Sequence, residues 1–229
     1  MTGGWFVGAG VTDTGGRARN EDAFLSHGAV HIVADGMGGH LAGAAASRAV
    51  VEAMRPLSQL EPVRPDDVAG AVVRAQDAVE RLAERLGGAS GSTLTGAVAV
   101  EHDDEPWWMV VNVGDSRVYA LEGGALEQVT VDHSYVQTLV DRGDITRAQA
   151  DGHPDRNIVT RAIGDGRRGF DAWMVPARPG MRLIIASDGL TKAVSDDRIA
   201  VIASLAGGVD AAAGRLVEAA LVPATTSRS

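Results

Sequence analysis

Four short segments of this sequence place acidic residues directly beside runs of apolar residues. They are Arg17-Ala-Arg-Asn-Glu-Asp22, Val33-Ala-Asp-Gly-Met-Gly-Gly-His40, Val113-Gly-Asp-Ser-Arg117 and Ile185-Ala-Ser-Asp-Gly-Leu190. A single Asp-Gly pair is usually only a turn. Carboxylates are hard oxygen ligands that suit Mg²⁺ or Mn²⁺. Four acidic segments spread over about 170 residues therefore indicate one site that binds more than one metal ion.

A two-metal site needs one carboxylate that bridges both ions, which together can hold a hydroxide and a phosphoryl group for in-line attack. Asp35 suits this role because it follows the strand-like run Val30–Ala34. Gly36 lets the backbone approach closely enough for its carbonyl oxygen to serve as a ligand. Glu21 and Asp22 are adjacent, so in an extended segment their side chains point to opposite faces. At most one of them is then a direct ligand, and Glu21 has the longer reach.

Two further side chains could take part in the chemistry, and the residues alone leave both roles open. Arg17 carries a planar guanidinium that can hold two phosphate oxygens, although a solvated loop arginine fits its position equally well. His40 opens a helical segment next to Asp35 and is the best candidate for an acid that protonates a leaving oxygen. A structural role at the helix N-terminus fits His40 equally well.

Composition favours one globular domain and excludes several classes of function. The chain has 229 residues, of which 45% are hydrophobic and 22% charged. The absence of cysteine excludes thiolate metal sites and cysteine nucleophiles. A net charge of −9 without a long basic cluster argues against nucleic-acid binding. Because no apolar run approaches the roughly 20 residues of a membrane span and no signal-peptide pattern opens the chain, we expect a cytoplasmic protein without membrane association, and a monomer by default.

The elements that must position these residues follow from the apolar patterns. Strand-like runs rich in Val, Ile, Trp and Tyr are predicted at Phe6–Val11, Val30–Ala34, Leu94–Val100, Trp107–Val113, Arg117–Leu121 and Arg182–Ala186. Helical periodicity and capping residues predict helices at Ala42–Met54, Asp66–Leu86, Asp196–Leu205 and Ala211–Leu221, the last capped by Asp210. Strands and helices occur in separate blocks, which predicts an α+β fold with antiparallel sheets.

One region differs from the rest. Residues 133–168 are polar and rich in Asp, Arg and Gly, so we expect an insert, or flap, beside the main sheets. The tail at residues 222–229 is expected to be disordered. No repeat or linker is evident, which predicts a single domain over residues 1–229.

Five motifs together resemble one known family in their order and spacing. They are Arg-x-x-Asn-Glu-Asp (17–22), Ala-Asp-Gly-Met-Gly-Gly-His (34–40), Gly-Ser-Thr (91–93), Gly-Asp-Ser-Arg (114–117) and Ala-Ser-Asp-Gly-Leu (186–190). The family is the metal-dependent serine/threonine protein phosphatases, the PPM or type 2C class, in their compact bacterial form. The resemblance covers roughly residues 5–221.

The resemblance implies a fold, an activity and a site. The implied fold is a four-layer sandwich of two antiparallel sheets flanked by helix pairs, with Mn²⁺ or Mg²⁺ at one end. Two ions are implied, together with a third that is seen in bacterial members. The implied ligands are carboxylates and one carbonyl: Glu21, Asp22 (through bound water), Asp35, the Gly36 carbonyl and Asp188 for the two-ion centre, and Asp115 with Asp188 for the third ion. Arg17 would hold the phosphate of a phosphorylated Ser/Thr protein, and a cognate kinase pathway is the implied partner.

The sequence departs from the family pattern in one place. Family members end with a Gly-x-Asp-Asn segment and a final strand, whereas no Asp-Asn pair occurs in these 229 residues. One alternative is therefore a weakened phosphatase-like module that binds phosphate or a partner protein. If another carboxylate supplies the absent ligand, Asp165 in the flap is the first candidate. A phosphatase with an aspartate nucleophile is disfavoured, because Gly-Met-Gly follows Asp35 where that class has an Asp-x-Asp motif.

Overall fold

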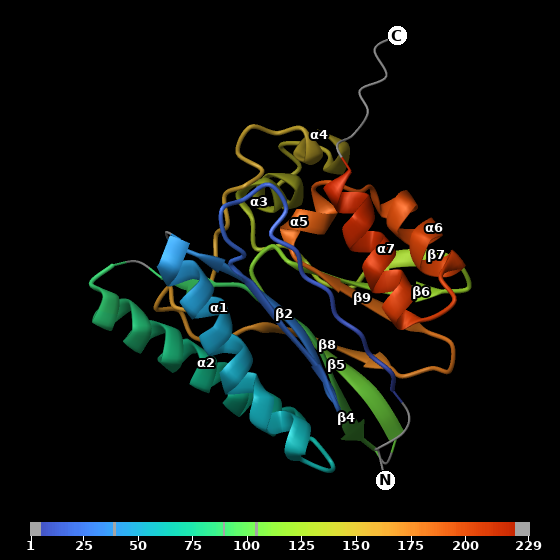
Figure 1. Cartoon of the computed structure of the whole chain (residues 1–229), viewed down its shortest axis with the longest axis horizontal. Coiled ribbons are helices and arrows are strands. Elements are labelled where there is room, and N and C mark those ends of the chain that lie inside the picture. The colour runs from blue at the N-terminus through green and yellow to red at the C-terminus, as the bar shows by residue number, and fades with distance from the viewer. Residues whose placement is uncertain (1–5, 39, 89, 104, 223–229) are drawn as a thin grey trace.

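Two antiparallel sheets pack face to face, and each carries helices on its outer side (Figure 1). The computed structural model describes residues 6–38, 40–88, 90–103 and 105–222. Within this part of the chain the layers run helices, sheet, sheet, helices. The predicted α+β sandwich is therefore confirmed.

The larger sheet has the strand order β1-β2-β4-β5-β8, with the short β3 paired to the end of β2. Its strands are β1 (Asp22–His27), β2 (Val30–Met37), β3 (Gly91–Ser92), β4 (Leu94–His102), β5 (Glu105–Val113) and β8 (Asp171–Pro176). In β2 every second residue is buried, which is the period of a strand with one fully covered face. By contrast, seven consecutive residues of β4 are buried because the sheet is covered on both faces there.

The smaller sheet has the order β7-β6-β9. Its strands are β6 (Arg117–Glu122), β7 (Ala125–Gln128) and β9 (Arg182–Ala186). Gly123 and Gly124 close the β6–β7 hairpin with φ angles of 59° and 86°, a conformation that few other residues adopt. Between the two sheets, Ala97, Val110 and Val118 form a buried cluster lined by Trp108 and Trp173.

Helix pairs cover the outer faces. The helices are α1 (His40–Met54), α2 (Pro65–Leu86), α3 (Tyr135–Asp141), α4 (Arg147–Asp151), α5 (Asp188–Thr191), α6 (Asp196–Leu205) and α7 (Val209–Leu221), with a 3₁₀ turn η1 at Arg55–Gln59. Helices α1 and α2 share the main core with the larger sheet, and α6 and α7 pack on the smaller sheet around Tyr119. Among the described residues, no helix has both the length and the apolar character needed to cross a membrane.

Several local predictions were wrong. Residues 6–11 form no strand. Instead they cross over the larger sheet: the ring of Phe6 packs at a tilt against Trp108, and Gly8 and Gly10 lie so close to His31 and Phe24 that a Cβ at either glycine would clash with these rings. Strands β7 and β8 were not predicted, and neither were the helices of the insert. The N-cap of α7 is Gly208 rather than Asp210, which lies in the first turn and still suits the helix dipole.

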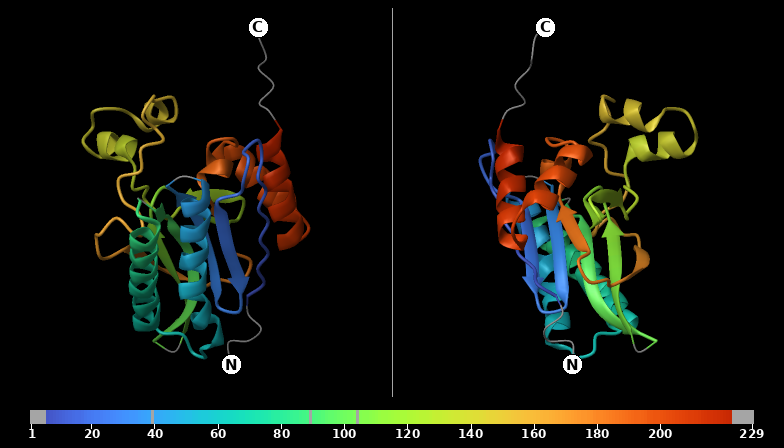
Figure 2. Two further views of the ribbon diagram at one scale, coloured as in Figure 1. Left: turned by 60° about the vertical axis from the view of Figure 1, so that its left-hand side comes forward. Right: turned by 90° about the vertical axis from the view of Figure 1, so that its right-hand side faces the viewer.

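One end of the sandwich gathers the segments that carry the acidic motifs. The end of β2, the start of β6 and the end of β9 lie there, and Arg117 pairs with Ala186 across the smaller sheet. The loop at residues 11–20 reaches the same end, from which α3 and α4 of the predicted flap project (Figure 2). Of the predicted disordered tail only Val222 is described, and residues 223–229 lie outside the described residues.

Candidate metal centre

Three of the predicted carboxylates meet at this end of the sandwich. The register of the β1–β2 hairpin places Asp22 opposite Asp35. Asp188 begins α5, directly after β9. The Asp35 carboxyl lies within hydrogen-bonding distance of both other carboxyls, and the charge of Asp115 acts on it as well. Segments that are far apart in the sequence thus bring four acidic side chains together.

The electrostatics of the cluster are those of carboxylates held close together and partly buried. Burial, and then repulsion by Asp22 and Asp188, raise the pKa of Asp35 to about 9. Burial also raises the pKa of Asp22, against hydrogen bonding by Ser187. The pKa of Asp115 is raised to about 6 by burial and by the charge of Asp188. Carboxylates crowded in this way are stabilised when divalent ions neutralise them, so the donor set fits Mg²⁺ or Mn²⁺.

The carboxylate oxygens are nevertheless turned toward protein partners. Ser187 Oγ donates to Asp22 Oδ2 over 2.8 Å, and the ammonium of Lys192 lies 2.5 Å from Asp188 Oδ2. Within the described part of the chain, no group of three or more His, Asp or Glu side chains is already arranged to hold a metal ion.

The Gly-Ser-Thr motif fixes the backbone at Asp35. Thr93 Oγ1 accepts a hydrogen bond from the Asp35 amide over 2.9 Å. The Thr93 amide donates to the Asp35 carbonyl over 2.8 Å. Thr93 Oγ1 also lies 2.9 Å from the buried hydroxyl of Ser116, next to Asp115. In the sequence this motif is recognisable only as part of the family pattern. Nothing in the sequence predicts that it links the segments of Asp35 and Asp115.

Gly36 is required by close packing rather than by a turn. A Cβ at Gly36 would lie 2.1 Å from the carbonyl oxygen of Gly43 in α1. The Gly36 amide donates to the carbonyl of Glu21 over 3.1 Å. The side chain of Glu21 reaches α1, where its Oε2 lies 2.7 Å from the position of a Cβ at Gly43. The predicted ligands Glu21 and Gly36 are therefore direct neighbours, beside Asp35.

Of the two predicted catalytic residues, the structure describes the side chain of Arg17 but not that of His40. Arg17 is exposed in the loop before β1. Its positive charge offsets part of the rise in the pKa of Asp22 that burial causes, so the guanidinium lies near the acidic cluster. His40 is the first residue of α1. Its side chain lies outside the described residues, so its role stays a prediction.

His133, at the base of the flap, is hydrogen-bonded to Gly114, the residue before Asp115. The Gly114 amide donates to His133 Nδ1 over 3.1 Å, and the His133 amide donates to the Gly114 carbonyl over 2.9 Å. On its other side His133 Nε2 lies 3.2 Å from Asp171, which pairs with Arg161 over 3.1 Å. Because Nδ1 accepts a hydrogen bond, the ring proton of neutral His133 is on Nε2.

Asp165, the suggested substitute ligand, takes no part in the acidic cluster. Its two oxygens accept hydrogen bonds from the amides of Ala162 and Arg167. Asp165 therefore closes a turn within the flap.

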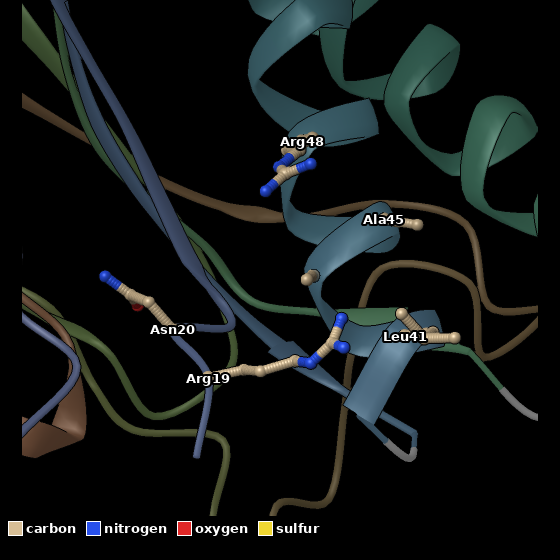
Figure 3. A pocket seen from close by; sticks show the side chains of 6 residues that line it. Arg19, Asn20, Leu41, Ala45 and Arg48 are labelled. Carbon is tan, nitrogen blue, oxygen red and sulfur yellow. The ribbon is translucent and has the colours of Figure 1, made fainter. Parts of the chain in front are cut away.

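A hollow of about 400 Å³ lies between the loop before β1 and the start of α1. It is lined by Arg19, Asn20, Leu41, Ala44, Ala45 and Arg48. Figure 3 shows Arg19 extending from the loop toward α1, and Arg48 extending from α1 back toward the loop. Sequence reasoning missed this site, although the lining residues of α1 have the spacing of one helix face.

Comparison with known proteins agrees with this fold. The family model described as protein phosphatase 2C matches residues 10–222. The chain belongs to this family. It is 36% identical over 218 residues to the serine/threonine protein phosphatase PstP of Mycobacterium tuberculosis, an alignment that covers 90% of this chain and 40% of that protein. The chain thus spans well under half the length of this relative.

Solved structures of type 2C phosphatases match most of the chain. The PPM Ser-Thr phosphatase MsPP from Mycobacterium smegmatis, in complex with cacodylate, superposes with a TM-score of 0.84 at 36% identity, covering 93% of this chain and 90% of that one. The catalytic domain of PstP in complex with two manganese ions superposes with a TM-score of 0.81 at 34% identity, covering 93% and 87%. The resemblance drawn from the five motifs is therefore confirmed.

Proposed function

We propose that this chain is a serine/threonine protein phosphatase that uses Mn²⁺ or Mg²⁺. The observation that carries the proposal is the crowding of Asp22, Asp35 and Asp188, where burial, and then repulsion by the other two carboxylates, raises the pKa of Asp35 to about 9. Homologues of this chain are named serine/threonine phosphatases, and one structural neighbour was solved with two manganese ions. Both facts support a divalent cation site at this cluster.

In this proposal Asp35 is shared by two ions. Glu21 and the Gly36 carbonyl lie next to Asp35 and would hold one ion, with Asp22 acting through water. Asp188, which interacts with the Asp35 carboxyl, would hold the second. When bound, the ions would supply the chemistry of a metal-dependent hydrolase, in which water is activated for in-line attack on phosphorus and the charge on the phosphoryl oxygens is neutralised.

The residues of the chain then have distinct tasks. Arg17 would orient the phosphate, because its guanidinium is exposed beside the cluster and can take two phosphoryl oxygens. Thr93 holds the Asp35 backbone from both sides, so that the shared ligand stays in place. His40 remains the candidate acid for the leaving hydroxyl, since it begins α1 shortly after β2 ends.

The wider setting follows from this activity. Substrates would be proteins phosphorylated on Ser or Thr by a cognate kinase pathway. The chain would act as a monomer in the cytoplasm, as a single domain with a flap over residues 133–168, where α3 and α4 lie beside the site.

Phosphate release from a phosphothreonine peptide tests the proposal. Protein stripped with a chelator should be inactive, and added Mn²⁺ should restore turnover. A protein that binds the phosphopeptide without releasing phosphate in saturating Mn²⁺ would contradict the proposal and support the alternative, a phosphate-binding module. An Asp35→Ala variant provides the control, since loss of the shared ligand should abolish turnover.

A further inference from the structure

The side chain of Lys192 lies between two of the acidic residues. Its Nζ is 2.5 Å from Asp188 Oδ2 and 3.7 Å from Asp115 Oδ2. Lys192 follows Asp188 by one helical turn, and its amide donates to the Asp188 carbonyl over 2.9 Å. The Asp115 side chain is only 7% exposed, so the ammonium is its nearest source of positive charge among the described residues.

Lys192 is also unusual within the composition of the chain. It is the only lysine among 21 basic residues, the others being arginine. An ammonium is a compact point charge, whereas a guanidinium is a planar fork that spreads its charge. A point charge between two carboxylates is the arrangement that a metal ion would otherwise provide.

Asp115 and Asp188 are the two residues that the family resemblance assigns to a third ion. In this chain the space between them does not fit one, because both carboxylates already face the ammonium of Lys192. A divalent cation in that place would be repelled by the ammonium and would find only two protein carboxylates, each shared with a competing partner.

We infer that the ammonium of Lys192 takes the place of a third metal ion. It neutralises Asp115 and Asp188, and it leaves a centre for two exchangeable ions. Lys192 is a positioning residue in this account, since it acts through the two carboxylates. The inference rests on the proposed function, because it concerns the same metal centre.

Metal stoichiometry tests the inference without using activity. Protein equilibrated with saturating Mn²⁺ and analysed by isothermal titration calorimetry and elemental analysis should contain two ions per chain. Lys192→Ala and Lys192→Gln should each bind one additional, weaker ion, whereas the charge-retaining Lys192→Arg should bind two. Three ions in the wild-type protein, or two in both neutral variants, would overturn the inference. A wild-type protein that binds no Mn²⁺ would instead overturn the proposed function.

The single lysine offers a second, spectroscopic measurement. Reductive methylation with ¹³C-formaldehyde keeps the charge and labels one side chain, besides the terminal amine. Paramagnetic Mn²⁺ should broaden the dimethyl-lysine signal beyond detection, whereas Mg²⁺ should leave it sharp. A signal that stays sharp in the Mn²⁺-loaded protein would show that Lys192 does not lie at the metal centre.

A separate observation concerns the hollow lined by Arg19 and Arg48. Both arginines are exposed, and among the described residues neither guanidinium has a hydrogen bond or an ion pair. In a chain with a net charge of −9, two unpaired arginines at one hollow favour an anionic ligand. Because Arg19 lies two residues from Arg17 and two from Glu21, the hollow borders the place where the substrate phosphate would bind.

We propose that this hollow binds an anionic group of the substrate, a carboxylate or a second phosphate, near the phosphorylated residue. The proposal rests on the proposed function. An extended peptide advances by about 3.3 Å per residue, so a group two or three residues away can reach from the phosphate site to the hollow. The exposed Leu41 at its edge would contact the apolar part of the intervening side chains.

Three phosphothreonine peptides test this specificity. They are identical except for Gln, Glu or a second phosphothreonine three residues from the first. We expect wild-type kcat/KM to favour at least one anionic peptide over the Gln peptide by about 10-fold, and the peptide that is favoured identifies the ligand as carboxylate or phosphate. In Arg48→Ala the preference should fall to about 2-fold, whereas Arg85→Ala, an exposed position on α2, should keep it.

Two results would overturn the specificity proposal: the absence of any preference in the wild-type protein, or an unchanged preference in Arg48→Ala. If no peptide is hydrolysed in Mn²⁺, the proposed function fails instead. The two failures are therefore distinguishable.

Discussion

Replacing Asp35 with asparagine should stabilise the metal-free protein in a pH-dependent way. The substitution keeps the shape of the side chain and removes one charge from the acidic cluster. Without metal, burial and the repulsion by Asp22 and Asp188 raise the pKa of Asp35 from 3.8 to about 9. A carboxyl whose pKa is raised in the folded state contributes its full stability below pH 3.8 and loses it as the pH rises toward 9. Wild-type protein therefore loses stability between pH 5 and pH 8 through this group, and the variant does not.

The magnitude follows from the pKa difference. Each pH unit above the unfolded pKa costs at most about 1.4 kcal/mol, which sets an upper limit near 6 kcal/mol at pH 8 for a pKa raised from 3.8 to about 9. Asp35 retains some contact with solvent, so we take about half of this limit. At about 2–4 °C per kcal/mol for a chain of this size, Asp35→Asn should raise the Tm by about 6–12 °C at pH 8 and by no more than about 3 °C at pH 5.

Thermal unfolding in excess chelator, followed by fluorescence or circular dichroism, measures this difference. Asp151→Asn is the matched control, because Asp151 is exposed on α4 and its loss should change the Tm equally at both pH values. Adding Mn²⁺ should then raise the Tm of wild-type protein at pH 8 but leave that of Asp35→Asn nearly unchanged. A variant no more stable than wild type at pH 8 would refute the reasoning, because Asp35 would then not be held among repelling carboxylates.

Three further predictions concern the neighbours of Asp35. Arg17→Ala should raise KM for a phosphopeptide about 10-fold with metal content unchanged. Equal KM values for wild type and variant in steady-state assays would show that Arg17 is a solvated loop residue. Thr93→Val leaves the Asp35 amide and the Ser116 hydroxyl without their partner, so chemical unfolding should show a loss of about 2–3 kcal/mol, and a loss below 0.5 kcal/mol would contradict this. Asp115→Ala should lower turnover while two ions stay bound in a crystal or in elemental analysis; the loss of both ions would show that Asp115 belongs to the main centre.

The sequence predicted the parts of the fold whose burial follows a simple period. Strand β9 was predicted with its observed bounds, and α2 begins and ends within one residue of its predicted limits. In α2 the apolar spacing, the acidic first turn and Gly87 at the C-terminus all agree. Local signals of this kind also placed Asp35 at the end of a strand, where the structure has it near the end of β2.

The failures occurred where long-range packing decides the outcome. The apolar residues 6–11 resemble a strand, but Gly8 and Gly10 let the segment lie flat across the side chains of β1 and β2. Nothing near Thr93 in the sequence predicts that its side chain accepts a hydrogen bond from the backbone of Asp35. Lys192 was missed for the same reason, since its partner Asp115 is distant in sequence and comes near only in the folded chain.

A parallel titration of metal-stripped protein with Mn²⁺ tests the central claim most directly. Bound Mn²⁺ and the rate of phosphate release from a phosphothreonine peptide are measured in the same samples, for wild-type protein and for Asp35→Asn. The account predicts no turnover without metal, full turnover when two ions are bound, and neither binding nor turnover in the variant over the same range. Full turnover by metal-free protein, or its absence when two ions are bound, would contradict the claim that this acidic cluster is the centre of a metal-dependent phosphatase.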